Sequence, residues 1–384
     1  ARDLRHVKVN AGTDLERLDG FDITVASEVM AILCLSEGIA DLKEKLSNIL
    51  VAYNKKGEPV YLKDLKIEGV ITSLLKDAIK PNIVQTLENN PAIIHGGPFA
   101  NIAHGCNSIL ATKTALKFAD YVITEAGFGA DLGAEKFLNI KCRKAGLKPK
   151  AAVVVATIKA LKLHGDIEEK DLKEENLEAL AKGVQNLEKH IENLRKFNLP
   201  IVVALNVFVT DTEKELAFLE NWAKEQGVEF SRTEVWEKGG LGGVDLAEKV
   251  VKAVEENDKE LQLLYKDEAS ITEKIETVCR EIYGADGVNF SDEVKAEIER
   301  IESLGFKHLP VCMAKTPASL TDNAKIKGRP TGFNITINDV KLRSGAGFVV
   351  AYANKVLTMP GLPKVPSALN IDIDEETETI IGIF

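Results

Sequence analysis

Short runs of apolar, β-branched residues alternate with long amphipathic stretches along this chain. The runs have strand length, and we expect strands at Ala92–His95, Tyr121–Thr124, Ala152–Ala156, Ile201–Leu205 and Leu309–Met313. The amphipathic stretches predict helices at Val25–Leu46, Asn107–Phe118, Asn176–Lys196, Asp211–Glu225, Val244–Glu255, Glu260–Ile282 and Asp292–Leu304. Apolar strands that alternate with helices indicate an α/β fold with a mostly parallel sheet covered by helices.

The C-terminal part has a different pattern. Phe333–Leu342 and Phe348–Met359 flank the glycine-bearing turn RSGAG, which predicts a β-hairpin. At 384 residues the chain is long enough for two domains. We therefore expect an α/β core at residues 1–267 and a smaller C-terminal α/β lobe at residues 268–384.

Charge and cysteine usage narrow the class of protein. The formal net charge of −10 argues against nucleic acid as the main partner, because its phosphate backbone is also negative. No stretch approaches the ~20 apolar residues of a membrane helix, so we expect no membrane partner. Cys34, Cys106, Cys142, Cys279 and Cys312 form no CxxC pair, which indicates reduced thiols in a cytoplasmic protein. Whether Cys106 takes part in chemistry stays open.

The residues that follow the predicted strands are polar or carry glycine. Open α/β sheets bind ligands beyond the carboxyl ends of their strands, so these residues predict the rim of a binding site. Ordinary polar loops are the alternative. The rim would contain His95-Gly96-Gly97, Glu125-Ala126-Gly127, Thr157, Asn206 and Lys315.

The segment HGGPFANIAHGCNS (His95–Ser108) has the most unusual composition. Its glycines allow backbone amides to approach an anion near the start of the next helix. His95 and His104 are candidates for acid–base groups. We predict no metal site, because no third ligand has suitable spacing. A hydrogen-bonded structural role is expected for at least one of the two histidines.

The segment EAGFGADLGAEKF (Glu125–Phe137) contains GxGxxxG. The spacing is one residue longer than in a dinucleotide fingerprint. The alternative hypothesis of a nicotinamide oxidoreductase depends on this motif alone. Close approach of the glycine backbone to another ligand is favoured. Phe128 stands between two glycines, and it is expected either to be buried or to contact a ligand.

The segment ALNVFVTDT (Ala204–Thr212) leaves a predicted strand with Asn206, Phe208 and Asp211. An amide and a carboxylate at a strand end can hydrogen-bond to the edge of a purine base. Alternatively, Asp211 caps the following helix.

A glycine-rich turn follows Trp236. Gly239, Gly240, Gly242 and Gly243 cost roughly 0.5–1 kcal/mol each relative to alanine when ordered, which favours close approach to a ligand. Trp236 would stack on a planar ring, for about 0.5–1.5 kcal/mol, or would lie in the core. The chain contains neither GxxxxGK[ST] nor GxSxG, so it carries no phosphate-binding P-loop of its own.

Several segments together resemble the formate–tetrahydrofolate ligase family. The similarity runs from about Gly20 to Phe384, and Val84–Phe137 is its most specific block. It is carried by VQTLENNPAIIHGGPFANIAHGCNS (Val84–Ser108), ADYVITEAGFGADLGAEKF (Ala119–Phe137), VATIKALKLHGD (Val155–Asp166), NLEKHIENL (Asn186–Leu194), EIYGADGVNF (Glu281–Phe290) and MPGLPKVPSALNIDI (Met359–Ile373).

The resemblance implies an ATP-dependent ligase of one-carbon metabolism. ATP with Mg²⁺ would phosphorylate formate to formyl phosphate, and N10 of tetrahydrofolate would attack the formyl carbon. The family fold implies a P-loop NTPase-like core, which is incomplete here, with residues 1–267 as the remainder of the nucleotide- and folate-binding domain. A cytoplasmic homotetramer is expected.

Site residues carry over only where the family's motifs match. Phe208 and Trp236 resemble an aromatic pair that sandwiches pterin or adenine, and Phe128 resembles a further aromatic contact. Lys159 replaces the family's usual arginine and loses its bidentate geometry. Val209 replaces a usual proline. The implied substrate- or nucleotide-binding residues are Phe128, Asn206, Phe208, Trp236, Gly239 and Gly240, with His95, Gly96, Gly97, Glu125, Thr157 and Lys159 as signature-loop candidates.

The family's catalytic residues are expected mainly in an N-terminal segment that includes the P-loop. This chain starts at Ala1 without it, so we expect a longer polypeptide and no turnover by these 384 residues alone. The competing hypothesis is a non-catalytic folate- or nucleotide-binding subunit of the same fold.

Overall fold

The computed structural model describes residues 6–353 and 364–383. The chain divides into two compact units, Ala1–Ser27 with Leu357–Phe384, and Glu28–Val356. The first contains two antiparallel hairpins and two short 3₁₀ turns, namely β1 (His6–Val9) with β2 (Arg17–Gly20), β15 (Asp372–Ile373) with β16 (Ile380–Ile381), η2 (Thr24–Ala26) and η9 (Ser367–Asn370). The predicted domain boundary between residues 267 and 268 lies inside the second unit and stays a prediction.

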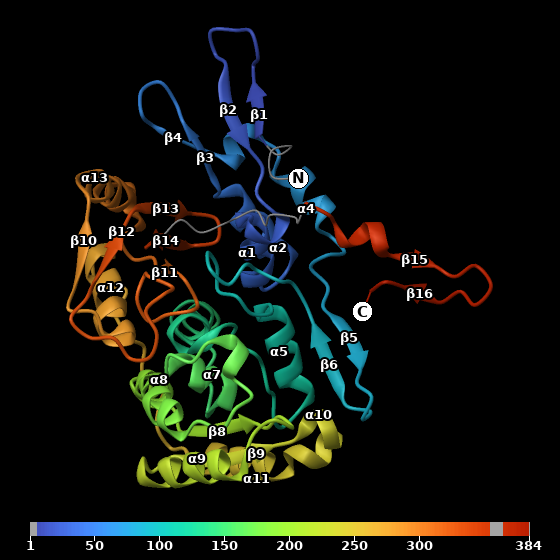
Figure 1. The fold of residues 1–384 in the computed structure, drawn as a ribbon. Helices are drawn as coiled ribbons and strands as arrows, with labels where there is room; N and C mark the ends of the chain where they lie inside the picture. Colours follow the sequence, from blue (N-terminus) through green and yellow to red (C-terminus); the bar gives the residue numbers. More distant parts are fainter. Residues whose placement is uncertain (1–5, 354–363, 384) are drawn as a thin grey trace. The chain divides into compact units, whose positions relative to one another are not determined.

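A three-stranded parallel sheet forms the part of the second unit that concerns the site (Figure 1). Its order is β7 (Ala152–Ala156), β8 (Ile201–Asn206) and β9 (Glu229–Thr233). All of β8 except Asn206 is buried, which its continuous apolar run predicts for a central strand. The predicted strands at Ala152–Ala156 and Ile201–Leu205 are confirmed, whereas the polar strand β9 was not predicted.

Helices cover one face of this sheet and, at β8 and β9, the other face as well, whereas Val153 and Val155 of β7 are exposed there. Ile201, Val203 and Leu205 share one core with α8 (Leu177–Arg195) and α9 (Glu213–Glu225). Side chains alternate along a strand, so Val202 and Ala204 face the other side, where α11 (Val244–Glu256) packs against β8 and β9. The periodic apolar residues of these helices confirm their predicted positions. The other helical elements here are α7 (Ile158–His164), η5 (Glu169–Asp171), α10 (Val235–Lys238) and η6 (Gly239–Gly243).

The expected single sheet is wrong for the two predicted strands that precede β7. Ala92–His95 lies largely in β6 (Pro91–Ile94), which pairs antiparallel with β5 (Asn82–Gln85). Tyr121–Thr124 forms no strand, and 88 % of Ile123 is exposed. An apolar β-branched segment forms a strand only where a neighbouring strand supplies hydrogen bonds.

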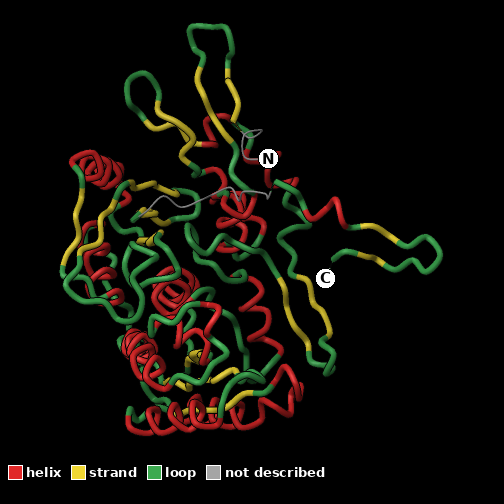
Figure 2. The backbone as a smooth tube through the Cα atoms, in the orientation of Figure 1, coloured by secondary structure: helices red, strands yellow, loops and turns green. Residues whose placement is uncertain are grey.

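The chain before β7 is mainly helical. The predicted helix Val25–Leu46 is interrupted near Gly38, while Ser108 caps the predicted helix that becomes α5. Figure 2 colours these helices red and the hairpin strands yellow. The elements are α1 (Glu28–Leu35), α2 (Ile39–Ser47), β3 (Leu50–Tyr53), β4 (Pro59–Tyr61), α3 (Leu62–Leu65), α4 (Glu68–Leu74), α5 (Ile109–Phe118), the π-helical η3 (Gly129–Ala134) and η4 (Phe137–Cys142), and α6 (Arg143–Ala145).

The C-terminal part combines two further sheets with helices. The predicted hairpin is confirmed for β13 and β14, while residues 354–359 of its second arm, and Met359–Pro363 of the last family segment, lie outside the described residues. The predicted helix Glu260–Ile282 begins only at Ile271, after the capping box of Ser270 and Glu273. The elements are α12 (Ile271–Val278), η7 (Cys279–Tyr283), β10 (Gly287–Phe290), α13 (Asp292–Ile301), η8 (Glu302–Phe306), β11 (Val311–Ala314), β12 (Asn334–Ile337), β13 (Asp339–Arg343) and β14 (Phe348–Tyr352). β10 pairs parallel with β12, and the other sheet has the order β11-β14-β13.

Candidate functional site

The carboxyl ends of β7, β8 and β9 lie at one edge of the parallel sheet. Ala156 pairs with Leu205, and Asn206 pairs with Thr233. This register gathers the segments that begin at Thr157, Asn206 and Glu234, as the strand-end rule predicts. Thr157 itself caps α7 by accepting a hydrogen bond from the Ala160 amide at 3.1 Å.

The turn after β8 presents Phe208 at this edge. Its backbone N–H donates to Asp211 Oδ2 at 2.8 Å, and the Asp211 N–H donates to the Phe208 carbonyl at 2.9 Å. Lys159 Nζ lies 4.4 Å from the centroid of the Phe208 ring, within range for a cation–π interaction. The helix cap is Thr212 and not Asp211. Burial raises the pKa of Asp211.

A buried ion pair contacts the backbone just after this turn, at Thr212. Lys162 Nζ donates to Glu215 Oε1 at 2.9 Å, and both side chains are at most 1 % exposed. The same carboxylate accepts hydrogen bonds from the backbone amides of Asn176 and Thr212, at 3.1 and 3.2 Å. The pair therefore ties α7, the start of α8 and the start of α9 together.

The segment after β9 is more exposed than the turn after β8. Trp236 is 86 % exposed, which excludes the alternative of a core tryptophan. None of the residues in α10, η6 and α11 is fully buried. The Gly240 amide donates to Glu88 at the tip of the β5–β6 hairpin. A Cβ on Gly240 would lie 2.2 Å from Glu88 Oε2, so a larger residue there would displace this exposed carboxylate.

Phe128 lies on a separate loop and is 49 % exposed. Since Tyr121–Thr124 forms no strand, neither Glu125 nor Phe128 follows a strand of the β7-β8-β9 sheet. Glu125 is exposed as well. The grouping of Phe128 with Phe208 and Trp236 therefore stays a prediction.

The segment His95-Gly96-Gly97 follows β6, which pairs with β5 and is not part of the β7-β8-β9 sheet. His95 is buried, with Nδ1 2.6 Å from Ser108 Oγ and Nε2 2.7 Å from the Ala78 carbonyl oxygen. Both ring nitrogens are thus occupied, which confirms the structural histidine that the sequence predicted. A Cβ on Gly96 would lie 2.3 Å from Cys34 Sγ. This glycine makes room for a buried thiol.

His104 and Cys106 are buried near lysines. Burial, followed by the nearby ammonium of Lys141, lowers the pKa of His104 to about 3, so its imidazole is neutral at neutral pH. Burial raises the pKa of the Cys106 thiol to about 11. A protonated, buried thiol is a poor nucleophile. The described residues bring together no group of three or more His, Cys, Asp or Glu side chains that would hold a metal ion.

Sequence reasoning did not single out the buried charges that support these loops. Asp131 Oδ2 accepts a hydrogen bond from Lys315 Nζ at 2.8 Å, and both side chains are at most 6 % exposed. Lys162 and Glu215 form the second such pair. Charged residues are usually exposed, so only their placement in a fold identifies them. Lys315 was predicted as a rim residue and is instead fully buried.

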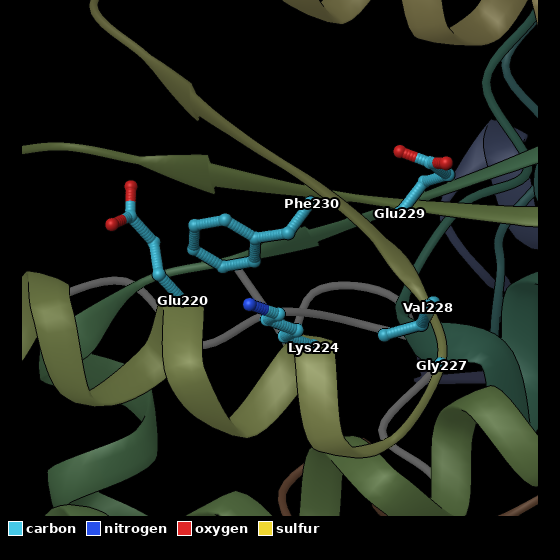
Figure 3. Close-up of a pocket in the computed structure, with 6 residues that line it drawn as sticks. All are labelled: Glu220, Lys224, Gly227, Val228, Glu229 and Phe230. Atoms are coloured by element: carbon cyan, nitrogen blue, oxygen red, sulfur yellow. The ribbon is translucent and has the colours of Figure 1, made fainter.

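A surface hollow lies at the opposite end of the sheet, where β9 begins (Figure 3). It contains none of the predicted site residues. Its lining is Glu220, Lys224, Gly227, Val228, Glu229 and Phe230.

The helices and the whole sequence also bear on the class of this protein. None of the described helices combines the length and the apolar character required to cross a membrane. The family model for formate–tetrahydrofolate ligase matches residues 1–384.

Proposed function

We propose, from the premise that this chain belongs to the formate–tetrahydrofolate ligase family, that the carboxyl edge of β7, β8 and β9 binds a planar ring of its substrates. Members of this family are ATP-dependent ligases that form a C–N bond in one-carbon metabolism. They use formate, tetrahydrofolate and ATP with Mg²⁺. Tetrahydrofolate and ATP each carry a flat heterocycle, pterin or adenine, that suits an aromatic site.

The pairing of Asn206 with Thr233 is the observation that carries this proposal. It brings the turn that holds Phe208 next to the turn that holds Trp236. Lys159 covers part of the Phe208 ring, while the ring is 38 % exposed and Trp236 is almost fully exposed. A ring stacked between them would bury apolar surface that the chain leaves in water.

The remaining predicted contacts follow from the same hypothesis. Asn206 offers an amide to the edge of the ring, and the Gly239–Gly240 backbone allows close approach. Phe128 would add an aromatic contact. Thr157, Lys159 and Glu125 would lie toward the polar part of the substrate. His95, Gly96 and Gly97 support the fold around Cys34 and are not proposed as ligand contacts.

The chemistry proposed for the complete enzyme has two steps. A formate oxygen attacks the γ-phosphorus of ATP, and the bond to ADP breaks, which gives formyl phosphate. N10 of tetrahydrofolate then attacks the formyl carbon, the bond to phosphate breaks, and N10 loses its proton. Mg²⁺ neutralises phosphate charge when bound with ATP. The described residues offer it no cluster of carboxylates, so no step is assigned to protein ligands of the metal.

The P-loop NTPase-like character of the core is part of the proposal. The 384 residues contain no GxxxxGK[ST] motif, so we propose that this chain alone does not turn over and that a further segment supplies the phosphate site. ATP-dependent formyl transfer by the pure chain would refute this. If the native polypeptide lacked such a segment, as its intact mass would reveal, a non-catalytic folate- or nucleotide-binding subunit would be favoured.

Two further properties concern the compartment and the oligomeric state. The five cysteines are buried free thiols, which suits a reducing compartment such as the cytoplasm. A homotetramer is proposed from the family, and light scattering during gel filtration tests it: a monomer at micromolar concentration would contradict it.

Calorimetric titration with tetrahydrofolate and with ATP, one at a time, tests the aromatic site. Phe208→Leu keeps an apolar side chain but loses stacking, so the ligand whose ring binds there should lose about 0.5–1.5 kcal/mol of affinity. Phe230→Leu, in the hollow at the other end of β9, is the matched control and should change neither affinity. Equal affinities for Phe208→Leu and the unaltered chain would contradict the proposed site.

A further inference from the structure

The Phe128 loop, Ala126–Gly133, has a tightly specified backbone and a half-exposed aromatic side chain. The Gly133 N–H donates to the Phe128 carbonyl at 2.6 Å. A Cβ on Gly133 would lie 2.2 Å from the Ala126 carbonyl oxygen. Gly127 has φ +81°, and a Cβ there would lie 2.9 Å from the Gly105 carbonyl oxygen. The loop thus folds back closely on itself while its phenylalanine points at least partly into water.

Asp131 fixes this loop from inside the protein. It stands three residues after Phe128, in the turn η3, and its side chain is buried. Asp131 Oδ2 accepts a hydrogen bond from Lys315 Nζ at 2.8 Å, and Oδ1 lies 4.0 Å from His190 Nδ1 on α8. An ionised carboxylate without these neighbours would be strongly disfavoured at this depth.

Lys315 is equally constrained. It directly follows β11 and is completely buried. Its ammonium group also donates to the carbonyl oxygens of Thr316 and Ser319, at 3.0 and 2.5 Å. Nζ lies 4.8 Å from the centroid of the Tyr283 ring. The lysine therefore connects the end of β11 rigidly to the Phe128 loop.

Stability alone does not account for such a pair. Two buried charges lose their hydration, and an apolar pair of similar volume often stabilises a fold as well or better. The ion pair also fixes orientation, because hydrogen bonds hold the Asp131 side chain at one position relative to β11 in a way that apolar contact does not. Since Asp131 belongs to the Phe128 loop, its position determines the orientation of the exposed Phe128 side chain.

We propose that Asp131 and Lys315 are positioning residues that hold Phe128 in the orientation in which its ring contacts a planar substrate. This inference rests on the proposed function, since it requires Phe128 to contact pterin or adenine. Neither Asp131 nor Lys315 touches the substrate in this proposal; both act through the loop.

A double-mutant cycle on the complete enzyme tests the proposal, with tetrahydrofolate and ATP titrated separately by calorimetry. Phe128→Ala should weaken binding of one ligand roughly 2- to 13-fold, the equivalent of one aromatic contact. Lys315→Met should weaken binding of the same ligand by a similar factor. In the Phe128→Ala background, Lys315→Met should produce no further loss, because the side chain through which it acts is gone.

Lys274→Met is the matched control. Lys274 is also fully buried and donates to three oxygens, the carbonyls of Asp267, Lys307 and Leu309, but it lies before β11 begins. It should reduce stability without changing either affinity. Should Lys315→Met fail to fold, Asp131→Asn keeps the side-chain shape, removes the charge and enters the same cycle.

The outcomes distinguish the proposed contact of Phe128 with substrate from the proposed positioning role of Asp131 and Lys315. If Phe128→Ala changes neither affinity, the proposed contact of Phe128 with substrate is wrong. If Phe128→Ala weakens binding but the effect of Lys315→Met adds to it in full, the positioning role is overturned. An equal loss of affinity in Lys274→Met would also overturn it, because general destabilisation would then explain the result.

Discussion

The two sides of the proposed binding site, which carry Phe208 and Trp236, are built in opposite ways. The Phe208 side rests on a strand that is buried throughout its apolar run and on the buried Lys162–Glu215 pair. The Trp236 side consists of α10, η6 and α11, in which no residue is fully buried. Apart from the packing of α11 against β8 and β9, its contacts include hydrogen bonds between exposed groups, such as that from the Gly240 amide to Glu88.

This difference separates the roles of the two aromatic side chains. Folding itself fixes the turn that carries Phe208, so that side is preorganised for a ligand. Trp236 gains little from folding, because it remains in water, and its apolar area is available for binding. Changes on the buried side should therefore affect stability first, whereas changes on the exposed side should affect binding first.

The largest expected effect is from Lys162→Met. It leaves Glu215 as an uncompensated charge in the core, which should cost about 3–5 kcal/mol of unfolding free energy. Urea unfolding at pH 7 measures this. Lys224→Met, at an exposed lysine of α9, should change stability by less than about 0.5 kcal/mol. Similar losses of unfolding free energy in both variants would show that the burial of the Lys162–Glu215 pair does not determine its contribution to stability.

Next in size is a pH effect at Glu135, close to the Phe128 loop. Burial raises the pKa of this carboxyl to about 7 from 4.5, despite a hydrogen bond from Asn139. Its stabilising contribution is complete below about pH 4.5 and is lost as the pH rises to about 7, with a slope of at most about 1.4 kcal/mol per pH unit.

Glu135→Gln should remove this dependence. The unfolding free energy of the variant minus that of the unaltered chain should rise between pH 5 and 7 and stay level above pH 8. Urea titrations across this range measure it. A difference that is independent of pH would mean that Glu135 is ionised throughout in the folded protein.

Trp236→Ala addresses the exposed side. We expect binding of tetrahydrofolate or ATP to weaken by about 0.5–1.5 kcal/mol or more, from the loss of stacking. Stability should change by no more than about 0.5 kcal/mol, because the side chain is exposed. Calorimetric binding and thermal unfolding give the two values. Unchanged affinity for both ligands together with a clear loss of stability would show that Trp236 supports the fold and does not contact a ligand.

The smallest effect is expected for Lys238→Met. This lysine forms an exposed i,i+4 ion pair with Glu234, at 2.6 Å, and such exposed pairs contribute little to the free energy of unfolding. The loss should disappear in 1 M salt, where surface charges are screened. The same substitution at Lys162 should remain severe in salt. A salt-resistant loss at Lys238 would show that the exposed side is more firmly held than its burial indicates.

Strong local patterns made part of the fold predictable. The apolar runs of β7 and β8 each predict a strand, and the apolar stripes of α8, α9 and α11 each predict a helix, because apolar side chains on these elements are covered by the core. Tyr121–Thr124 has the same strand-like composition but lacks a partner strand. The polar strand β9 pairs with β8 although its composition gives little sign of it, because pairing depends on neighbours and not on propensity alone.

The candidate site was also predictable from the sequence only in part. The strand-end rule found Thr157 and Asn206 from the sequence, and the turns after β8 and β9 carry Phe208 and Trp236. It failed for Lys315, which it placed on the rim, because an isolated lysine gives no sign of burial. Glu215 likewise has the appearance of an ordinary helix-surface glutamate until α9 is packed against α8.

Intrinsic fluorescence tests the central claim most directly. The chain has two tryptophans, Trp222 on α9 and the exposed Trp236. Titration with tetrahydrofolate or ATP should change the emission of the unaltered chain and of Trp222→Phe to saturation. In Trp236→Phe, calorimetry should still detect binding, since phenylalanine can stack, but the emission change should be lost. An undiminished emission change in Trp236→Phe would place the ligand elsewhere and contradict the account.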